Sequence, residues 1–118
     1  MQRIFPILQD SGKVGQTHVD IESHTKLTTL EEDPHSYFEF SNQVLLLPVS
    51  ELVLSRLRID GMVSANKLMK SAFMGQQKKR EPVTVSKLDS SRWLVVDGNS
   101  TVANAILSGW VKIPCVDN

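Results

Sequence analysis

Residues 95–110, VVDGNSTVANAILSGW, change their hydrophobic pattern in the middle. An apolar run ends at Asp97 and Gly98, a short polar segment follows, and apolar residues then recur at the spacing of a helix. The pattern predicts a strand, a sharp turn and a helix that starts near Ser100 and ends at Gly109, since glycine often ends a helix. Gly98 suits the turn because glycine adopts positive φ angles that other residues resist.

The polar segment of this turn has the composition of an anion-binding site. Asn99, Ser100 and Thr101 stand where the first backbone N–H groups of a helix lack intrahelical partners. Those N–H groups and the positive end of the helix dipole favour a bound anion such as phosphate. The same residues are also common at a helix start that binds nothing. The turn therefore has two interpretations, a capped helix start or a phosphate site at Gly98 and the three residues after it.

The composition fits one globular domain with an ordinary hydrophobic core. The chain has 118 residues, of which 41% are hydrophobic and 22% charged. Its 13 Lys and Arg residues balance 13 Asp and Glu residues, so no net charge draws it to nucleic acid or to a membrane surface. No apolar run approaches the roughly 18 residues that span a bilayer. We expect a cytoplasmic protein without membrane contact, whose phosphate recognition depends on a local basic patch.

The Cys and His residues point to no metal or redox centre. Cys115 is the only cysteine, so it has no internal disulfide partner, and it follows the apolar Ile113 and Pro114. We expect a buried and unreactive thiol. The three His residues lack metal-ligand spacing, so no metal site is predicted.

The hydrophobic pattern divides the chain at residue 43. Residues 1–43 have scattered apolar positions without a sustained period, and we expect an N-terminal arm or short peripheral elements there. Residues 44–118 predict a compact mixed α/β domain of the α+β kind, with a small mixed sheet and packed helices. We expect a buried strand at 44–49 and further strands at 82–88, 92–97 and 111–116. A helix is expected at 51–57, with Ser50 as its N-cap. After a break at Asp60 and Gly61, a second helix is expected to run from Met62 to a stop at Gly75.

Several residues occur in an order and spacing typical of one superfamily. They are Pro82, Asp97, Gly98, Ala103, Ala105, Gly109, Trp110, Ile113 and Pro114, and LLLPVSELVLSRLR at 45–58 adds an opening strand and helix. Residues 44–118 thereby resemble the ParB-like / sulfiredoxin superfamily. The resemblance implies a ParB/sulfiredoxin-like fold, with a nucleotide or nucleic-acid phosphate at the turn from Asp97 to Thr101. It leaves residues 1–43 unexplained.

The turn departs from the usual superfamily pattern. That pattern reads Gly-x-His-Arg or Gly-x-Arg-Arg, and its Arg grips the phosphate with its two-pronged guanidinium. Here Thr101 replaces the Arg, and Asn99 stands where a sulfiredoxin has its catalytic cysteine. The comparison therefore implies no sulfinic-acid reduction, and a bound phosphate would need a cation from elsewhere in the chain.

Two basic segments are candidates for that cation. Lys78, Lys79 and Arg80 precede a predicted strand, and in this fold class that position can lie beside the turn. A solvated basic loop is the other interpretation of these three residues. Arg56 and Arg58 form a second basic pair. The resemblance implies that Arg58 contacts the nucleotide, although a lone surface Arg needs no such role.

Asp97 and Glu51 are the candidate catalytic acids. Asp97 ends a strand directly before the turn, where a carboxylate can orient a hydroxyl group or hold Mg²⁺ through water. Its alternative role is to accept hydrogen bonds from the N–H groups of its own turn. For Glu51 the resemblance to kinase members implies a base, and the alternative is a favourable charge in a first helical turn. The implied cofactor is ATP or CTP with Mg²⁺.

Three functions follow from these observations, and the sequence leaves open whether the protein is an enzyme. The first is a nucleotide- or phosphate-binding domain that acts as a phosphotransferase or NTPase. The second is a non-catalytic module that keeps the fold and binds a protein partner. The third is a nuclease or nucleic-acid-binding domain that uses the same turn and residues 78–80. The balanced net charge argues against strong non-specific binding of nucleic acid.

Overall fold

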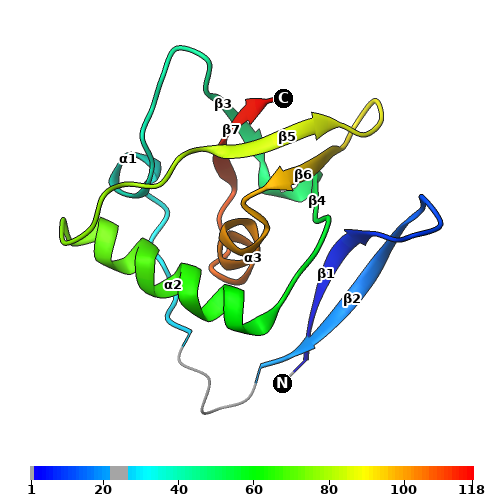
Figure 1. The fold of residues 1–118 in the computed structure, drawn as a ribbon, viewed down its shortest axis with the longest axis horizontal. Coiled ribbons are helices and arrows are strands. Elements are labelled where there is room, and N and C mark those ends of the chain that lie inside the picture. Colours follow the sequence, from blue (N-terminus) through cyan, green and yellow to red (C-terminus); the bar gives the residue numbers. More distant parts are fainter. Residues whose placement is uncertain (1, 22–26) are drawn as a thin grey trace.

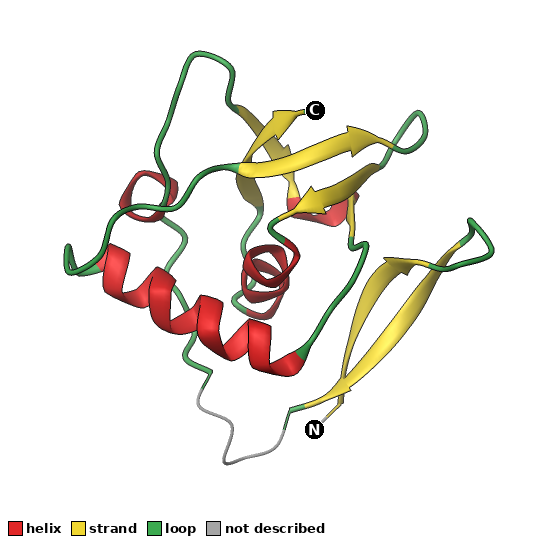
Figure 2. Cartoon of the chain, in the orientation of Figure 1, coloured by secondary structure: helices red, strands yellow, loops and turns green. Residues whose placement is uncertain are grey.

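The computed structural model describes residues 2–21 and 27–118 (Figure 1). Helices and strands are mixed along the chain (Figure 2), which confirms the predicted mixed α+β class. The elements in chain order are β1 (Gln2–Leu8), β2 (Val14–Asp20), α1 (Pro34–Tyr37), β3 (Leu45–Pro48), a 3₁₀ turn η1 (Val49–Glu51), β4 (Leu52–Val53), α2 (Ile59–Phe73), β5 (Val83–Lys87), β6 (Trp93–Asp97), α3 (Asn99–Leu107) and β7 (Lys112–Asp117).

A five-stranded mixed sheet forms the centre of the fold, with the strand order β3-β7-β5-β6-β4. β5 and β6 form an antiparallel hairpin, β7 pairs with β5 in parallel, and β4 pairs with β6 in parallel. β3 pairs with β7 in antiparallel orientation at the edge of the sheet. Figure 1 shows α3 between this sheet and α2. The central position of α3 explains why five consecutive residues of the helix, 101–105, are buried.

β1 and β2 form a separate antiparallel hairpin, which is attached to the chain just after β4. The backbone N–H of Leu8 donates to the Leu54 carbonyl at 2.9 Å, and the N–H of Leu54 donates to the Pro6 carbonyl at 3.0 Å. Phe5 of this hairpin is fully buried in the common core. The region predicted as an arm therefore contributes to the core, and the boundary at residue 43 stays a prediction.

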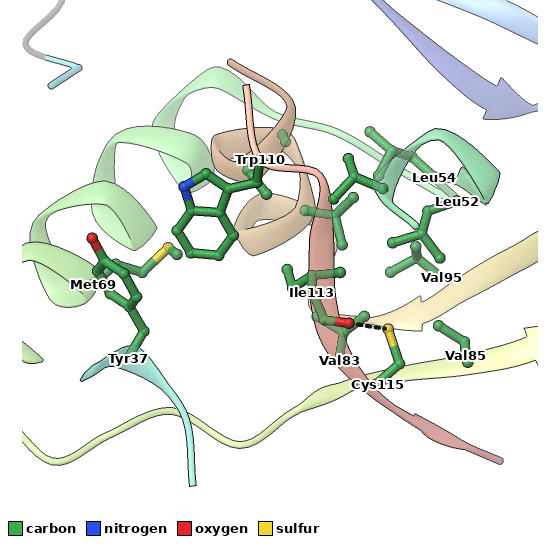
Figure 3. Close-up of a cluster of buried hydrophobic side chains, with 14 of the residues drawn as sticks. Tyr37, Leu52, Leu54, Met69, Val83, Val85, Val95, Trp110, Ile113 and Cys115 are labelled. Atoms are coloured by element: carbon green, nitrogen blue, oxygen red, sulfur yellow. Dashed lines mark hydrogen bonds between the residues drawn. The ribbon is translucent and has the colours of Figure 1, made fainter. Parts of the chain in front are cut away.

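Figure 3 shows the cluster of buried side chains around β7. The Trp110 ring packs against Tyr37 with ring centroids 5.1 Å apart, and its indole N–H donates to the Leu30 carbonyl at 2.8 Å. Cys115 is fully buried, and this burial raises the pKa of its thiol to about 12. The predicted burial of Cys115 is confirmed, and its unreactive character stays a prediction that a raised pKa favours.

Glycines end α2 and α3, as the sequence predicts. Gly75 and Gly109 each have a φ of +73°. After α3, the N–H of Gly109 donates to Ile106 and the N–H of Trp110 donates to Ala105, which is the Schellman pattern. These bonds satisfy carbonyl groups that would otherwise be unpaired at the helix end. Within the described ranges, no helix has the length and apolar character needed to cross a bilayer.

The predicted helix at residues 51–57 is wrong. The chain forms the 3₁₀ turn η1 and then β4, and Leu52, Val53 and Leu54 are all buried. Three consecutive buried residues suit an extended segment that is covered on both faces, whereas a helix with one buried face would expose some of them. Leu52 pairs with Trp93 of β6 instead.

The predicted chain break at Asp60 and Gly61 is also wrong, because α2 runs through both residues without interruption. A Cβ atom at Gly61 would lie only 2.8 Å from the side-chain oxygen of Ser100 on α3. The glycine is therefore explained by the close approach of two helices rather than by a turn.

β3 is a strand as predicted, but it is not buried. Leu45 and Leu46 are 42% and 48% exposed, because β3 lies at the edge of the sheet and has a neighbour on one side only. A short apolar run predicts a strand without indicating how many neighbours that strand has.

We expect Trp110→Phe to lower the free energy of unfolding by about 1–3 kcal/mol, because it removes the donor to the Leu30 carbonyl in the core. Urea unfolding followed by circular dichroism measures this change. Trp93→Phe is the matched control, since the Trp93 ring is partly exposed and lies 4.4 Å from the Lys87 ammonium group. Its expected cost is below about 1 kcal/mol. Equal losses from the two substitutions would contradict this account of Trp110.

Candidate functional site

The turn between β6 and α3 has the sharp geometry that the sequence predicts. Gly98 has a φ of +102° and is the N-cap residue of α3. A Cβ atom there would also lie 3.2 Å from the Val83 side chain of β5, so both the backbone angle and the space favour glycine. In the part of the chain that the structure describes, no side chain caps this helix start. The N–H groups of the first turn therefore remain able to bind a ligand.

The side chain of Asn99 is used inside the protein. It is 6% exposed, its Oδ1 accepts a hydrogen bond from the Ser55 N–H at 2.8 Å, and its Nδ2 donates to Ser55 Oγ at 2.9 Å. The Ser55 hydroxyl donates in turn to the Val95 carbonyl at 2.7 Å. We call Asn99, Ser55 and Val95 the Asn99 clamp. The clamp corrects the sequence interpretation, because the Asn99 side chain is occupied and only its backbone N–H is left for a phosphate.

Two adjoining cavities meet at this turn, and we call them together the trough. Arg80, Asp97, Gly98 and Thr101 line both cavities. The first cavity has a volume of about 390 Å³, and its other lining residues are Arg56, Leu57, Arg58, Gly61, Asn99 and Ser100. The second has a volume of about 410 Å³, and its other lining residues are Leu68, Gln77, Lys78, Lys79, Glu81, Pro82 and Val83.

Ser100 and Thr101 present the first turn of α3 to the trough. Ser100 lies against Gly61 at the start of α2 and lines the first cavity. Thr101 is only 3% exposed, yet it lines both cavities. Both residues are therefore where the sequence predicts them, at the open end of a helix.

Arg80 is the cation that the structure brings to this turn. Its backbone is fixed to the end of α1, because its N–H donates to the Tyr37 carbonyl at 2.7 Å and its carbonyl accepts from the Glu39 N–H at 2.9 Å. Its side chain is half-buried, and it has no hydrogen-bonded acceptor among residues 2–21 and 27–118. Burial lowers the pKa of Arg80 and the charge of Asp97 opposes this shift. The group stays protonated, as arginines in proteins do.

The other predicted cations lie at the two ends of the trough. Arg58 lines the first cavity, and so does Arg56. Lys78 and Lys79 line the second cavity. All four side chains are exposed, in contrast to the half-buried Arg80.

Glu51 is the one predicted site residue that does not line the trough. It directly precedes Leu52, which pairs with Trp93 at the start of β6, while Asp97 lies at the end of the same strand. Four residues of strand correspond to about 13 Å. Glu51 therefore lies away from the trough, and the catalytic role that the resemblance implies for it stays a prediction without support from this geometry.

Sequence reasoning missed the roles of Gly61 and Leu68, which form part of the α2 wall of the trough. A signal was present for Gly61, since a glycine next to a helical pattern often marks a close backbone approach. No comparable signal exists for Leu68, which resembles any apolar helix residue.

Comparison with solved structures identifies the architecture. A C-terminally truncated SbnI from Staphylococcus aureus superimposes with a TM-score of 0.52 at 21% sequence identity, over 64% of this chain. The chain has the ParB/sulfiredoxin-like fold. The match covers 30% of the SbnI chain. Sulfiredoxin from Arabidopsis thaliana matches with a TM-score of 0.44 at 12% identity, over 64% of this chain and 83% of that one. No protein-family model and no curated protein matches the sequence.

The polar groups of the site come from separate parts of the ParB/sulfiredoxin-like fold in this chain. The helix start carries no arginine, its Asn99 side chain is turned into the protein, and the half-buried cation comes from the segment before β5. The fold match at this level of identity accounts for the architecture, whereas the chemistry of the site depends on its own residues.

We expect Asn99→Ala to lower the free energy of unfolding by about 1–3 kcal/mol, because it leaves the Ser55 N–H without its acceptor and removes the donor to Ser55 Oγ. Ser55→Ala and the double variant complete a cycle, and we expect a coupling energy of about 0.5–3 kcal/mol from denaturant unfolding. Ser100→Ala is the control from the same helix turn. Additive effects of the two clamp substitutions would contradict the clamp.

Proposed function

We propose that the protein binds a nucleotide through its phosphate groups, which lie at the start of α3 beside the Arg80 guanidinium. The observation that carries the proposal is the half-buried Arg80 side chain, which has no hydrogen-bonded acceptor among the described residues and lines the same cavities as the start of α3. The unpartnered nitrogen atoms of Arg80 still reach solvent, so an anionic ligand in the trough can take the place of this water. A phosphate supplies acceptors in the geometry that matches the guanidinium.

The turn supplies the remaining donors. The backbone N–H groups of residues 99–101 and the positive end of the α3 dipole favour an anion at the helix start. Gly98 allows close approach to bare backbone, and Thr101 is part of the wall of the trough. In this proposal Arg80 performs the part that the superfamily assigns to the arginine that Thr101 replaces.

Asp97 supports a further step, the transfer or hydrolysis of a phosphoryl group. It is exposed, ends β6 and lines both cavities. Mg²⁺ is often bound by one or two carboxylates together with substrate phosphates. Among the described residues, no group of three or more His, Cys, Asp or Glu could hold a metal ion. We propose that ATP or CTP would bring Mg²⁺ with it, and that Asp97 would hold this ion through water or orient the attacking hydroxyl.

We expect Arg80→Ala to weaken nucleotide binding by about 10- to 100-fold, because it removes charge-assisted hydrogen bonds to phosphate. Calorimetric titration with ATP, CTP and GTP, with and without Mg²⁺, measures the affinity. Arg92→Ala is the matched control, since Arg92 is exposed and pairs with Asp89 in the β5–β6 turn. The proposal is wrong if the folded protein binds none of these nucleotides, or if Arg80→Ala leaves the affinity unchanged.

We expect Asp97→Asn to reduce phosphate release from the bound nucleotide by at least about 100-fold, because it removes the carboxylate that orients the nucleophile or metal. Its nucleotide affinity should stay within a few-fold of the wild type, since Arg80 and the helix start are intact. A colorimetric phosphate assay alongside the titration separates the two effects. Undiminished turnover would overturn the catalytic role, and binding without turnover in the wild type would indicate a non-catalytic nucleotide-binding module.

A further inference from the structure

Arg80 lies in a connecting segment whose other side chains are mostly exposed. Residues 74–82 connect α2 to β5, and residues 74–79 and 81 are exposed to solvent. At Arg80 the segment forms a parallel β-bridge with Phe38. The bridge consists of the bonds from the Arg80 N–H to the Tyr37 carbonyl, at 2.7 Å, and from the Glu39 N–H to the Arg80 carbonyl, at 2.9 Å. This bridge therefore determines where the Arg80 side chain begins.

The carbonyl that receives the Arg80 N–H belongs to the last residue of a very short helix. α1 consists of the four residues Pro34–Tyr37. A single helical turn is unstable in water, because forming it fixes several residues for very few hydrogen bonds. The position of the Tyr37 carbonyl therefore depends on the contacts that α1 makes with the rest of the protein.

The Tyr37 side chain makes such contacts. It is only 1% exposed, and its hydroxyl donates to the Glu31 carbonyl at 2.7 Å. Its ring centroid lies 5.1 Å from that of Trp110 and 5.3 Å from that of Phe73 (Figure 3 shows Tyr37 beside Trp110). Burial and the charges of Glu31 and Asp33 raise the pKa of this hydroxyl to about 12, so it stays a donor at neutral pH. Tyr37 lines neither cavity of the trough.

The acceptor of the Tyr37 hydroxyl lies in a segment that is attached to the end of α3. The N–H of Leu30 donates to Ser108 Oγ at 2.9 Å, and its carbonyl accepts from the Trp110 indole at 2.8 Å. The Glu32 carboxylate accepts from the N–H groups of the two residues after Trp110, at 2.7 and 3.2 Å. Glu31 lies between these two attachments and is therefore a fixed acceptor.

We propose that Tyr37 is a positioning residue for the phosphate site, because its hydroxyl bond to Glu31 holds the carbonyl that fixes Arg80. The inference rests on the proposed function, in which Arg80 meets the phosphate. The contacts run from the C-terminal end of α3 through Glu31 and Tyr37 to Arg80, which lines the trough at the start of the same helix. Without the hydroxyl bond, Arg80 keeps its charge but loses its fixed position, and a ligand must then immobilise it on binding.

Tyr37→Phe tests the proposal, since it keeps the ring and removes only the hydroxyl. Amide hydrogen exchange of the full chain, followed by NMR, should show the Arg80 N–H exchanging at least about 10-fold faster relative to the core amides of β5 and β6. Calorimetry should show an affinity for ATP with Mg²⁺ that is about 3- to 10-fold weaker, the size expected for one hydrogen bond. In the Arg80→Ala background, the same substitution should change the affinity less than about 2-fold, because Tyr37 acts through Arg80.

Ser108→Ala is the matched control. It removes a hydrogen bond to the neighbouring Leu30, which stays attached through the Trp110 indole. It should leave the Arg80 amide exchange and the ATP affinity within about 2-fold of the wild type. Equal effects of Ser108→Ala and Tyr37→Phe would overturn the proposal, as would an effect of Tyr37→Phe on affinity that persists without the Arg80 side chain.

A measurement on the wild type does not depend on the folding of any variant. Because coupling between two sites is reciprocal, saturating ATP should slow the exchange of the Arg80 N–H at least about 3-fold. ATP that binds without slowing this exchange would overturn the proposal.

The outcomes also separate this inference from the proposed function. ATP binding that depends on Arg80 but not on Tyr37 overturns the inference alone. If the protein binds no nucleotide, the proposed function is wrong, and the Arg80 amide exchange in Tyr37→Phe alone decides whether Tyr37 positions Arg80.

Discussion

The sharp turn at Gly98 is the constraint on which the rest of the structure depends. Its φ of +102° directs α3 back beneath the sheet, and a Cβ atom at that point would crowd the Val83 side chain. Because α3 is buried along most of its length, the open end of the helix is held in a fixed position. The Asn99 clamp then fixes the segment that carries Arg56 and Arg58 to the same point.

Two parts of the chain that are distant in sequence complete the site around this turn. The helix start supplies backbone donors, and the segment before β5 supplies Arg80, whose backbone is bonded to the end of α1. A half-buried cation that lines the same cavities as a helix start with unpaired N–H groups favours an anionic ligand there. The proposed function rests on this combination of cation and helix start rather than on the fold match.

The sequence predicted the elements whose patterns are local. The β5–β6 hairpin, α3, β7 and the glycines that end both long helices depend on short-range periodicity and backbone angle. The errors have tertiary causes. The segment 52–54 is extended because the sheet and the hairpin cover it, and Gly61 continues a helix because Ser100 packs against it. The sequence of the β1–β2 hairpin has no sustained alternation of apolar and polar residues, since most of its side chains are only partly buried or exposed.

The site was predictable to a similar degree. The turn and the basic segment at 78–80 could be proposed from residue type and order. The sequence could not distinguish Arg80 from Lys78 and Lys79, because the distinction comes from hydrogen bonds to Tyr37 and Glu39 some forty residues earlier. It also could not show that the Asn99 side chain is occupied, since its partner Ser55 is 44 residues away.

The most direct test of the central claim is a backbone and arginine side-chain NMR titration with inorganic phosphate and then with ATP. The account predicts that the largest chemical-shift changes occur at the amides of Asn99, Ser100 and Thr101 and at the Arg80 side-chain N–H. Changes confined to other parts of the surface, such as the cavity beside Lys70, Phe73 and Met74, would contradict it. The absence of any change at saturating ATP would contradict it as well.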